Sequence, residues 1–525
     1  MTQFSCLRML FPRFFTLRRV LIAFLVTAIF TSVLPETALA RTAPPQQAES
    51  IQPYLDRVID NLTEFRLDNG MKFIVLERHE APVVSFMTYA DVGGVDEAEG
   101  KTGVAHFLEH LAFKGTTRIG TKNYEQEKIL LGRLDLIAEK IQEATSAGIQ
   151  AEVARLQKLF DDTEAEAQKL VKQNEFGQIV EQAGGVGLNA NTSTDATRYM
   201  YSFPANKVEL WMSLESERFL DPVFREFYKE KEVILEERRL RVDNSPIGTM
   251  VEAMLDKAYD VHPYKRPVIG YDKDIRNLTR EDVQKFFDAH YYPRNLTIAI
   301  VGDVNPAQVK ELAQVYFGRY KAKAAVEAKI EAEPPQKATR EVTVQLPTQP
   351  WYLEAYHRPS INDPDNAVYD IIGRLLSDGR TSRLYKSLVE KQQLALSAQG
   401  FSGFPGNKYP NLMLFYALTA PGRTADEVGA ALEKEVTKLN TERVSALELD
   451  RVKTQARAEL LRSLDSNMGM AELLLEYEVK TGSWRNLFKQ LEAIAAVTPG
   501  DIERVAKATF QPQNRTIGRL LPQEK

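Results

Sequence analysis

The chain has 525 residues, a formal net charge of -5 and a hydrophobic share of 44%. This balance is typical of globular proteins, and the length allows more than one hydrophobic core. No basic stripe and no glycine-rich phosphate-binding loop appears, which argues against a nucleic-acid-binding or nucleotide-binding protein.

The first 40 residues predict an export signal. Arg18 and Arg19 precede an apolar run at residues 20–33, and small residues at 38–40 offer a cleavage site. The run is short for a bilayer span, so an uncleaved membrane anchor is the less favoured alternative. The single cysteine, Cys6, lies in this segment, and cleavage would leave a mature chain without disulfides. An exported protein of this kind is typical of a bacterial periplasm, which is the predicted location.

Ordered structure is expected after a loose lead-in at residues 41–52, which is rich in alanine, proline and glutamine. Residues 65–76 predict two strands joined by an Asn-Gly turn. A further strand is expected at residues 83–92, where Gly93 and Gly94 close it. Strands next to long helical segments predict an α+β fold class.

A proline-free, apolar stretch at residues 102–113 predicts a mostly buried helix that carries His106, Glu109 and His110. The spacing of four residues places both imidazoles on one helix face, with Glu109 beside them. Two imidazoles suit catalytic zinc, and a carboxylate that is not a ligand can accept a proton from the attacking water. A lone histidine is more typical of packing or capping, but the H-x-x-E-H combination favours the metal site of an inverted zincin.

Residues 123–184 predict a charged helical insertion within the first domain. Two apolar helix faces are expected on either side of a break at residues 146–148. A solvated projection without chemistry is the simpler interpretation, and gating or partner contact is the alternative. The two faces consist of Leu130, Leu134, Ile137 and Ile141, and of Ile149, Val153, Leu156 and Phe160.

Residues 187–201 are rich in threonine, tyrosine and short polar residues, which predicts a strand or strand pair at a sheet edge. An exposed edge can capture an extended peptide through main-chain hydrogen bonds. An edge strand that binds nothing fits these residues equally well.

The third metal ligand must come from another segment. Residues 226–241 predict a helix dense in carboxylates, most of which must be ordinary solvated charges. Glu230 and Glu237 are two helical turns apart and share one face, so either carboxylate is a candidate. The residues themselves do not choose between them.

A weak internal repeat accounts for the rest of the chain. A capped helix, a proline turn and a strand at residues 279–298 recur at residues 498–517, a constant offset of 219 residues. We therefore predict two tandem homologous domains, at residues 53–320 and 340–525, joined by a linker at 321–339. The second copy contains no H-x-x-E-H sequence and is expected to bind no metal.

These motifs resemble the pitrilysin or insulinase family of zinc peptidases, whose members include the mitochondrial processing peptidase. The resemblance covers nearly all of the chain after the export signal. It implies one Zn²⁺ per chain, with His106, His110 and Glu237 as ligands, and Glu109 as the catalytic base. It also implies a supporting role for Glu230. The family's substrate-binding edge strand matches Asn189 and Ala190, and the long spacing from His110 to Glu237 is explained by the helical insertion.

The second half departs from the family pattern. Active members carry an arginine and a tyrosine seven residues apart that help bind the peptide carbonyl. Val389 and Leu396 occupy those positions here, and neither side chain donates a hydrogen bond. We therefore expect a heterodimer in which a paralogous subunit supplies the missing pair.

The resulting prediction is a zinc-dependent endopeptidase that hydrolyses extended peptides or unfolded polypeptides inside a closed chamber. The main alternative is a non-catalytic structural or assembly subunit, because some family members have lost activity. A zinc hydrolase acting on a non-peptide substrate is a third possibility without a supporting feature. No nucleic acid is expected as a partner, and membrane contact is expected only through an uncleaved signal.

Overall fold

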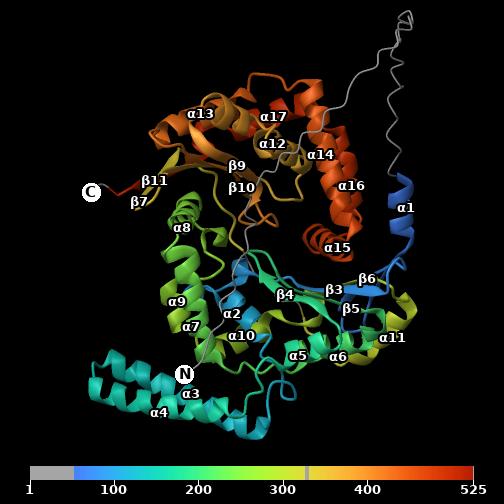
Figure 1. The fold of residues 1–525 in the computed structure, drawn as a ribbon, viewed down its shortest axis with the longest axis vertical. Coiled ribbons are helices and arrows are strands. Elements are labelled where there is room, and N and C mark those ends of the chain that lie inside the picture. Colours follow the sequence, from blue (N-terminus) through green and yellow to red (C-terminus); the bar gives the residue numbers. More distant parts are fainter. Residues whose placement is uncertain (1–51, 325–329, 524–525) are drawn as a thin grey trace, which may run out of the picture. The chain divides into compact units, whose positions relative to one another are not determined.

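The structure is a computed structural model that describes residues 52–324 and 330–523 (Figure 1). The predicted export signal lies outside the described residues. So do residues 41–51 of the lead-in and residues 325–329 of the linker. Within the described ranges, no helix combines the length and apolarity needed to cross a bilayer.

Two β-sheets with one topology form the framework. The first sheet has the order β1-β2-β6-β3-β5-β4, and the second has the order β7-β11-β8-β10-β9. In each sheet one pair is parallel, β2 with β6 and β7 with β11, and the other pairs are antiparallel. The second sheet therefore repeats the first without its edge strand β1, and the predicted α+β fold with two homologous domains is confirmed. The strands of the first sheet are β1 (Leu62–Arg66), β2 (Lys72–Glu77), β3 (Val83–Ala90), β4 (Val186–Thr192), β5 (Thr197–Pro204) and β6 (Leu296–Gly302), and those of the second are β7 (Arg340–Leu346), β8 (Trp351–Arg358), β9 (Ala395–Phe404), β10 (Asn411–Thr419) and β11 (Arg515–Pro522).

Helices cover both sheets (Figure 1). One buried core joins the first sheet to its helices, and Phe86 stacks on Trp211 of α6 within it, with ring centroids 4.5 Å apart. A second core joins α12, α13 and α17 to the second sheet. The helices are α1 (Gln52–Asp60), α2 (Val104–Leu111), α3 (Tyr124–Ser146), α4 (Gln150–Gln168), α5 (Glu175–Gln182), α6 (Val208–Leu220), α7 (Phe227–Arg238), α8 (Pro246–Ala258), α9 (Asp272–Asn277), α10 (Arg280–His290), α11 (Pro306–Phe317), α12 (Asn366–Ser377), α13 (Ala425–Lys438), α14 (Ala446–Asp465), α15 (Asn467–Thr481), α16 (Asn486–Ala496) and α17 (Pro499–Thr509).

The structure also reproduces the internal repeat. Capping boxes at Thr279 and Thr498 start α10 and α17, because each threonine accepts a hydrogen bond from the main chain three residues on. A proline turn then leads from each helix into β6 or β11. Both copies therefore place a strand in the interior of their sheet by the same local signals.

The two halves exchange a helix. From the first half, α8 packs on β7 and β11, and from the second half α15 packs on β3 and β6. Ser245 and Ser466 cap these helices by accepting the N–H of Gly248 and Gly469. This Ser-x-x-Gly pair also repeats, from residue 245 to 466, but the sequence interpretation did not single it out. Each sheet therefore depends on a helix from the other half of the chain.

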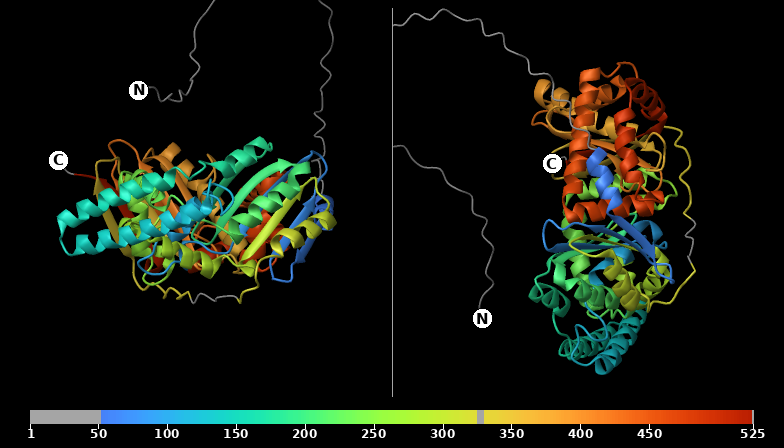
Figure 2. Two further views of the ribbon diagram at one scale, coloured as in Figure 1. Left: turned by 90° about the horizontal axis from the view of Figure 1, so that it is seen from below. Right: turned by 90° about the vertical axis from the view of Figure 1, so that its right-hand side faces the viewer.

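The insertion is a helical hairpin, as predicted, and α3 and α4 lie side by side (Figures 1 and 2). Leu134, Ile137, Leu156 and Phe160 form a small core between them. The assignment of Ile149 to the apolar face was wrong, because this residue precedes α4 and its side chain is 54% exposed.

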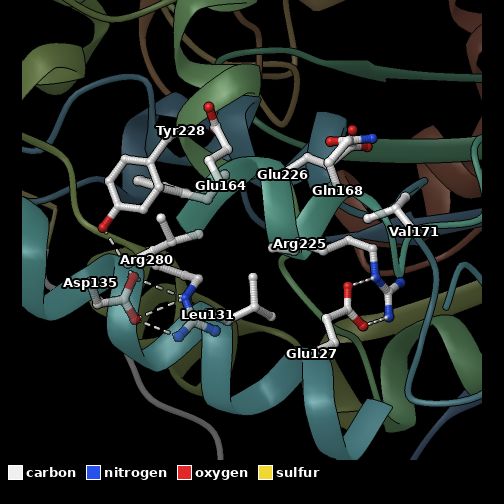
Figure 3. Close-up of a pocket in the computed structure, with 13 residues that line it drawn as sticks. Glu127, Leu131, Asp135, Glu164, Gln168, Val171, Arg225, Glu226, Tyr228 and Arg280 are labelled. Carbon is white, nitrogen blue, oxygen red and sulfur yellow. Dashed lines mark hydrogen bonds and ion pairs between the residues drawn. The ribbon is translucent and has the colours of Figure 1, made fainter. Parts of the chain in front are cut away.

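A buried and a more exposed ion pair hold the hairpin to the residues just before α7 and to α10, around a small pocket (Figure 3). Arg225 donates to Glu127 at 2.8 Å, and both side chains are almost completely buried. Arg280 and Tyr228 both donate to Asp135. The charges that line this pocket are therefore largely engaged in joining the insertion to the first half.

Candidate metal centre

Helix α2 starts at a tightly constrained residue. Gly103 has φ +87°, and a Cβ there would lie 2.7 Å from the carbonyl oxygen of Ile269, so glycine is required. The buried Glu97 carboxylate accepts the N–H groups of Gly103 and Ala105, both at 3.0 Å. The helix therefore begins at Val104 rather than at residue 102, and its first turn is fixed against the neighbouring loops.

Helix α7 runs beside α2. Phe227 stacks on Phe107 of α2 with ring centroids 4.6 Å apart, while Ile234 and Leu235 are buried in the first core. A π-helical segment at residues 239–243 continues α7. This packing directs one carboxylate-bearing face of α7 towards the two histidines.

His106, His110 and Glu237 converge, with one potential ligand atom of each within 4.8 Å of the others. Glu237 Oε2 lies 3.8 Å from His106 Nε2 and 3.5 Å from His110 Nε2, which is too long for good hydrogen bonds. Two ligand atoms on a tetrahedral zinc ion lie about 3.4 Å apart, so these separations fit a shared ion. The buried His106 Nδ1 has no hydrogen-bond partner in the described part of the chain. Of the two carboxylates left open by the sequence, Glu237 lies at the imidazoles' Nε2 atoms.

The protonation states also suit a metal. Burial, followed by the neighbouring His110, lowers the pKa of His106 to about 4, so its imidazole is neutral near pH 7. The His110 imidazole lowers the pKa of Glu237 more than burial raises it, which keeps this carboxylate ionised. Neutral imidazoles and an ionised carboxylate are the forms that coordinate zinc.

Glu230 lies on the other side of His110. Its Oε1 is 4.0 Å from His110 Nδ1 and 3.0 Å from Lys114 Nζ. Arg241 pairs with Oε1 of Glu237 at 2.7 Å. The sequence interpretation missed Lys114 and Arg241, although the spacing of four residues from Glu237 to Arg241 on one helix is a signal for such a pair.

Glu109 is held by the edge strand. Thr192, the last residue of β4, donates its hydroxyl to Glu109 Oε2 at 2.6 Å. Burial raises the pKa of Glu109, and the hydrogen bond from Thr192 opposes that rise. The sequence interpretation did not identify Thr192, because only the folded sheet brings it to α2.

Asn189 and Ala190 lie on β4, which pairs with β5 on one side and forms the edge of the first sheet. The Asn189 side chain is exposed, and Ala190 is buried. Together with Glu109 and His110, they line a pocket of about 330 Å³. The structure thus brings the predicted edge strand next to the histidine helix.

Val389 and Leu396 lie in the second half. Val389 belongs to a π-helical segment, Tyr385–Lys391, and packs against the second core. Leu396 is near the start of β9 with a side chain that is 52% exposed. Neither supplies a hydrogen-bond donor from its side chain.

This fold and site define a two-domain α+β protein with a candidate inverted-zincin metal centre in its first domain. The sequence matches the description "Insulinase (Peptidase family M16)" at residues 72–148 and 149–272, and "Peptidase M16 inactive domain" at residues 277–456. The chain belongs to the insulinase family, peptidase family M16.

Several relatives are named as peptidases. The chain is 29% identical to the zinc protease PqqE of Helicobacter pylori, over 87% of this chain and 92% of that protein. It is 24% identical to a probable mitochondrial-processing peptidase subunit beta of Arabidopsis thaliana, over 87% of this chain and 77% of that protein. A crystal structure of a protease from Helicobacter pylori matches with a TM-score of 0.74 and 27% identity, covering 88% of this chain and 99% of that chain. These relatives support a peptidase role and imply zinc as the metal.

Proposed function

We propose that the protein is a zinc-dependent endopeptidase that hydrolyses extended peptides or unfolded polypeptides. The observation that carries this proposal is the convergence of His106, His110 and Glu237 beside Glu109, a carboxylate that is not part of the three-ligand group. A catalytic zinc site needs three protein ligands and a separate proton acceptor, and the chain offers both.

Each residue has a distinct role in this proposal. His106, His110 and Glu237 hold the metal, and Glu230 supports His110 from its other ring nitrogen. Bound zinc would supply Lewis acidity, which polarises a peptide carbonyl and lowers the pKa of water. Glu109 accepts a proton at its carboxylate and delivers it to the leaving amine, and the Thr192 hydroxyl orients this carboxylate.

The edge strand β4 supports the choice of an extended substrate. Its outer edge is without a strand partner among the described residues, and Asn189 and Ala190 share a pocket with Glu109 and His110. A peptide added to this edge would be held mainly by main-chain hydrogen bonds, so little sequence preference is expected. Enclosure of this edge in a chamber would favour unfolded over folded substrates.

We also propose a heterodimer of this chain with a paralogous subunit. The support is the pair of apolar side chains Val389 and Leu396 at positions where active relatives are expected to carry an arginine and a tyrosine. The test is whether the native protein co-purifies with a second chain of similar size, and whether that chain raises the peptidase rate. Full activity of the isolated chain would contradict this part of the proposal.

The proposed location is the bacterial periplasm, reached through the export signal at residues 1–40. The support is the sequence pattern alone, since these residues lie outside the described ranges. Determining the N-terminus of the protein from its native source tests it, and a start at Arg41 is the expected result.

The central experiment measures zinc content and cleavage of a quenched, unstructured peptide. The Glu109→Gln variant should keep zinc and lose turnover by roughly a hundredfold or more, because the proton acceptor is removed. Glu237→Gln should lose zinc, whereas Glu236→Gln, at a neighbouring carboxylate that is exposed and pairs with Arg239, should change neither. The proposal fails if the wild-type protein binds zinc but Glu109→Gln cleaves peptides equally fast.

The same experiment tests the non-catalytic alternative. An assembly subunit would show no difference between wild type and Glu109→Gln in peptide cleavage, with or without its partner. The convergence of three potential ligands favours the enzyme, because a purely structural role does not require two imidazole Nε2 atoms held near one carboxylate oxygen at distances too long for good hydrogen bonds.

A further inference from the structure

We infer that Asp195 is a positioning residue for Glu109, through which the second half of the chain sets the geometry of the active site. This inference rests on the proposed peptidase function. The turn between β4 and β5 carries Thr192 at one end and the buried Asp195 in its middle.

Asp195 belongs to the first half of the chain but binds mainly to the second. Its side chain is 1% exposed, and Oδ2 accepts the N–H groups of Asn407 at 2.9 Å and Lys408 at 3.1 Å. Lys480 of α15 places Nζ 3.2 Å from the same oxygen and is itself buried. The other oxygen accepts the hydroxyl of Tyr264 at 2.5 Å. Four donors thus satisfy this carboxylate, and three of them come from the second half.

The turn that Asp195 fixes is short and closely packed. Ser193 and Ala196 close it with a main-chain hydrogen bond of 2.8 Å. Gly93 lies so near that a Cβ there would be 2.4 Å from the carbonyl oxygen of Ser193. Thr194 adds a further bond to the second half, from its hydroxyl to the carbonyl of Pro405 at 3.3 Å. Only three positions separate Asp195 from Thr192, so a displacement of the turn at Asp195 also moves Thr192.

Thr192 makes the connection to catalysis. Its hydroxyl is the donor to Glu109 Oε2, so its position decides where that carboxylate points. The loop at residues 405–408 and helix α15 thus hold the turn, and the turn holds the proton acceptor. Through this chain of contacts, the second half of the protein has a direct part in the catalytic geometry.

A second buried ion pair on the same helix provides a matched control. Glu478 of α15 binds Lys72 of β2 at 2.5 Å, and these side chains are 7% and 11% exposed. This pair also joins the two halves, but it contacts β2 and not the β4–β5 turn. Loss of either pair weakens the association of the halves, whereas only loss of the Asp195 contacts releases the turn.

The experiment compares Asp195→Asn with Glu478→Gln in kcat, KM and zinc content. Asp195→Asn should lower kcat by roughly 10- to 100-fold, the range for a misplaced charge-assisted hydrogen bond, with unchanged zinc content and KM. Glu478→Gln should leave kcat within about twofold of wild type at a temperature where both variants are folded. Thr192→Val should lower kcat as well, and combining it with Asp195→Asn should add little further loss. Equal kcat losses in Asp195→Asn and Glu478→Gln, or fully additive losses in the double variant, overturn the inference.

Hydrogen exchange gives a readout that does not need activity. Amides of the β4–β5 turn should exchange faster in Asp195→Asn than in wild type, but not in Glu478→Gln. If Asp195→Asn does not fold, Lys480→Met takes its place, with the same expected loss of kcat and the same faster exchange. Unchanged exchange at the turn overturns the inference. A wild-type protein that fails to cleave peptides but shows the expected exchange pattern would contradict the proposed function rather than this coupling of the turn to the second half.

Discussion

His262 should make the folded protein sensitive to mild acid. The side chain is 2% exposed, and its Nδ1 accepts the N–H of Tyr264 at 3.1 Å, which requires a neutral imidazole nitrogen. The rings of Tyr259, Tyr264 and Tyr409 surround it. Burial lowers its pKa to about 4, from an ordinary value of 6.5. The folded state therefore resists a proton that the unfolded chain binds readily.

This difference in pKa between the folded and the unfolded chain makes the folded protein less stable in acid. Below pH 6.5 the unfolded chain takes up a proton at this site while the folded chain does not until about pH 4, so the free energy of unfolding falls as the pH falls through this interval. At 1.36 kcal/mol per pKa unit, the largest possible loss is about 3 kcal/mol. The stabilising contribution is fully present above pH 6.5.

The perturbation is His262→Asn, which keeps an acceptor for the N–H of Tyr264 but cannot be protonated. Urea unfolding at about pH 7.5 and about pH 4.5 should show a smaller acid-induced loss of stability in the variant, by about 2–3 kcal/mol. Other titrating groups affect both proteins alike and cancel in the comparison. An equal loss in both proteins would refute the reasoning.

Three further predictions concern the metal site and the insertion. Glu230→Gln should weaken zinc binding by roughly 10- to 100-fold in competition with a chelator, because a carboxylate beside a ligating imidazole raises the basicity of that imidazole. Unchanged zinc affinity would contradict this role of Glu230. Chelation should lower the thermal midpoint of the wild-type protein. If free zinc stood at a hundred times its Kd, removing it should lower the free energy of unfolding by about 2.7 kcal/mol. Glu237→Ala should show no such shift on chelation. Arg225→Met should cost about 3–5 kcal/mol in urea unfolding by leaving Glu127 buried without its partner, and a cost below that of Arg280→Met, at a more exposed pair, would contradict this reasoning.

Local sequence signals were sufficient for much of the fold. The Asn-Gly turn, the apolar periodicity of the insertion and the repeated threonine caps each act within a few residues, and each is found where it was predicted, apart from Ile149. The paired imidazoles also follow from local spacing, because a helix fixes residues four apart on one face. The choice between Glu230 and Glu237 was different, since both share one helix face and only the packing of α7 on α2 separates them.

Contacts between distant segments could not be predicted in this way. Thr192 reaches Glu109 across 83 residues, and Asp195 of the first half reaches Lys480 near the end of α15 in the second half. Neither pair has a spacing pattern, because their proximity depends on strand order and on which sheet a helix covers. The exchange of α8 and α15 left a faint sequence trace, the repeated Ser-x-x-Gly, but a cap signal marks where a helix begins and not which surface it packs on.

The exchanged helices link the second half of the chain, which has no copy of the H-x-x-E-H motif, to the candidate metal centre in the first half. Because α15 packs on β3 and β6 and its Lys480 binds Asp195, the second half contributes both to the stability of the first sheet and to the turn that orients Glu109. In return, α8 covers β7 and β11 and follows directly on the segment that carries Glu237 and Arg241. A shift of the second sheet relative to the first would thus act on both the helix that carries Glu237 and the strand whose Thr192 donates to Glu109. The packing of the second half is therefore part of the proposed catalytic arrangement, even though the second half contains no copy of the H-x-x-E-H motif.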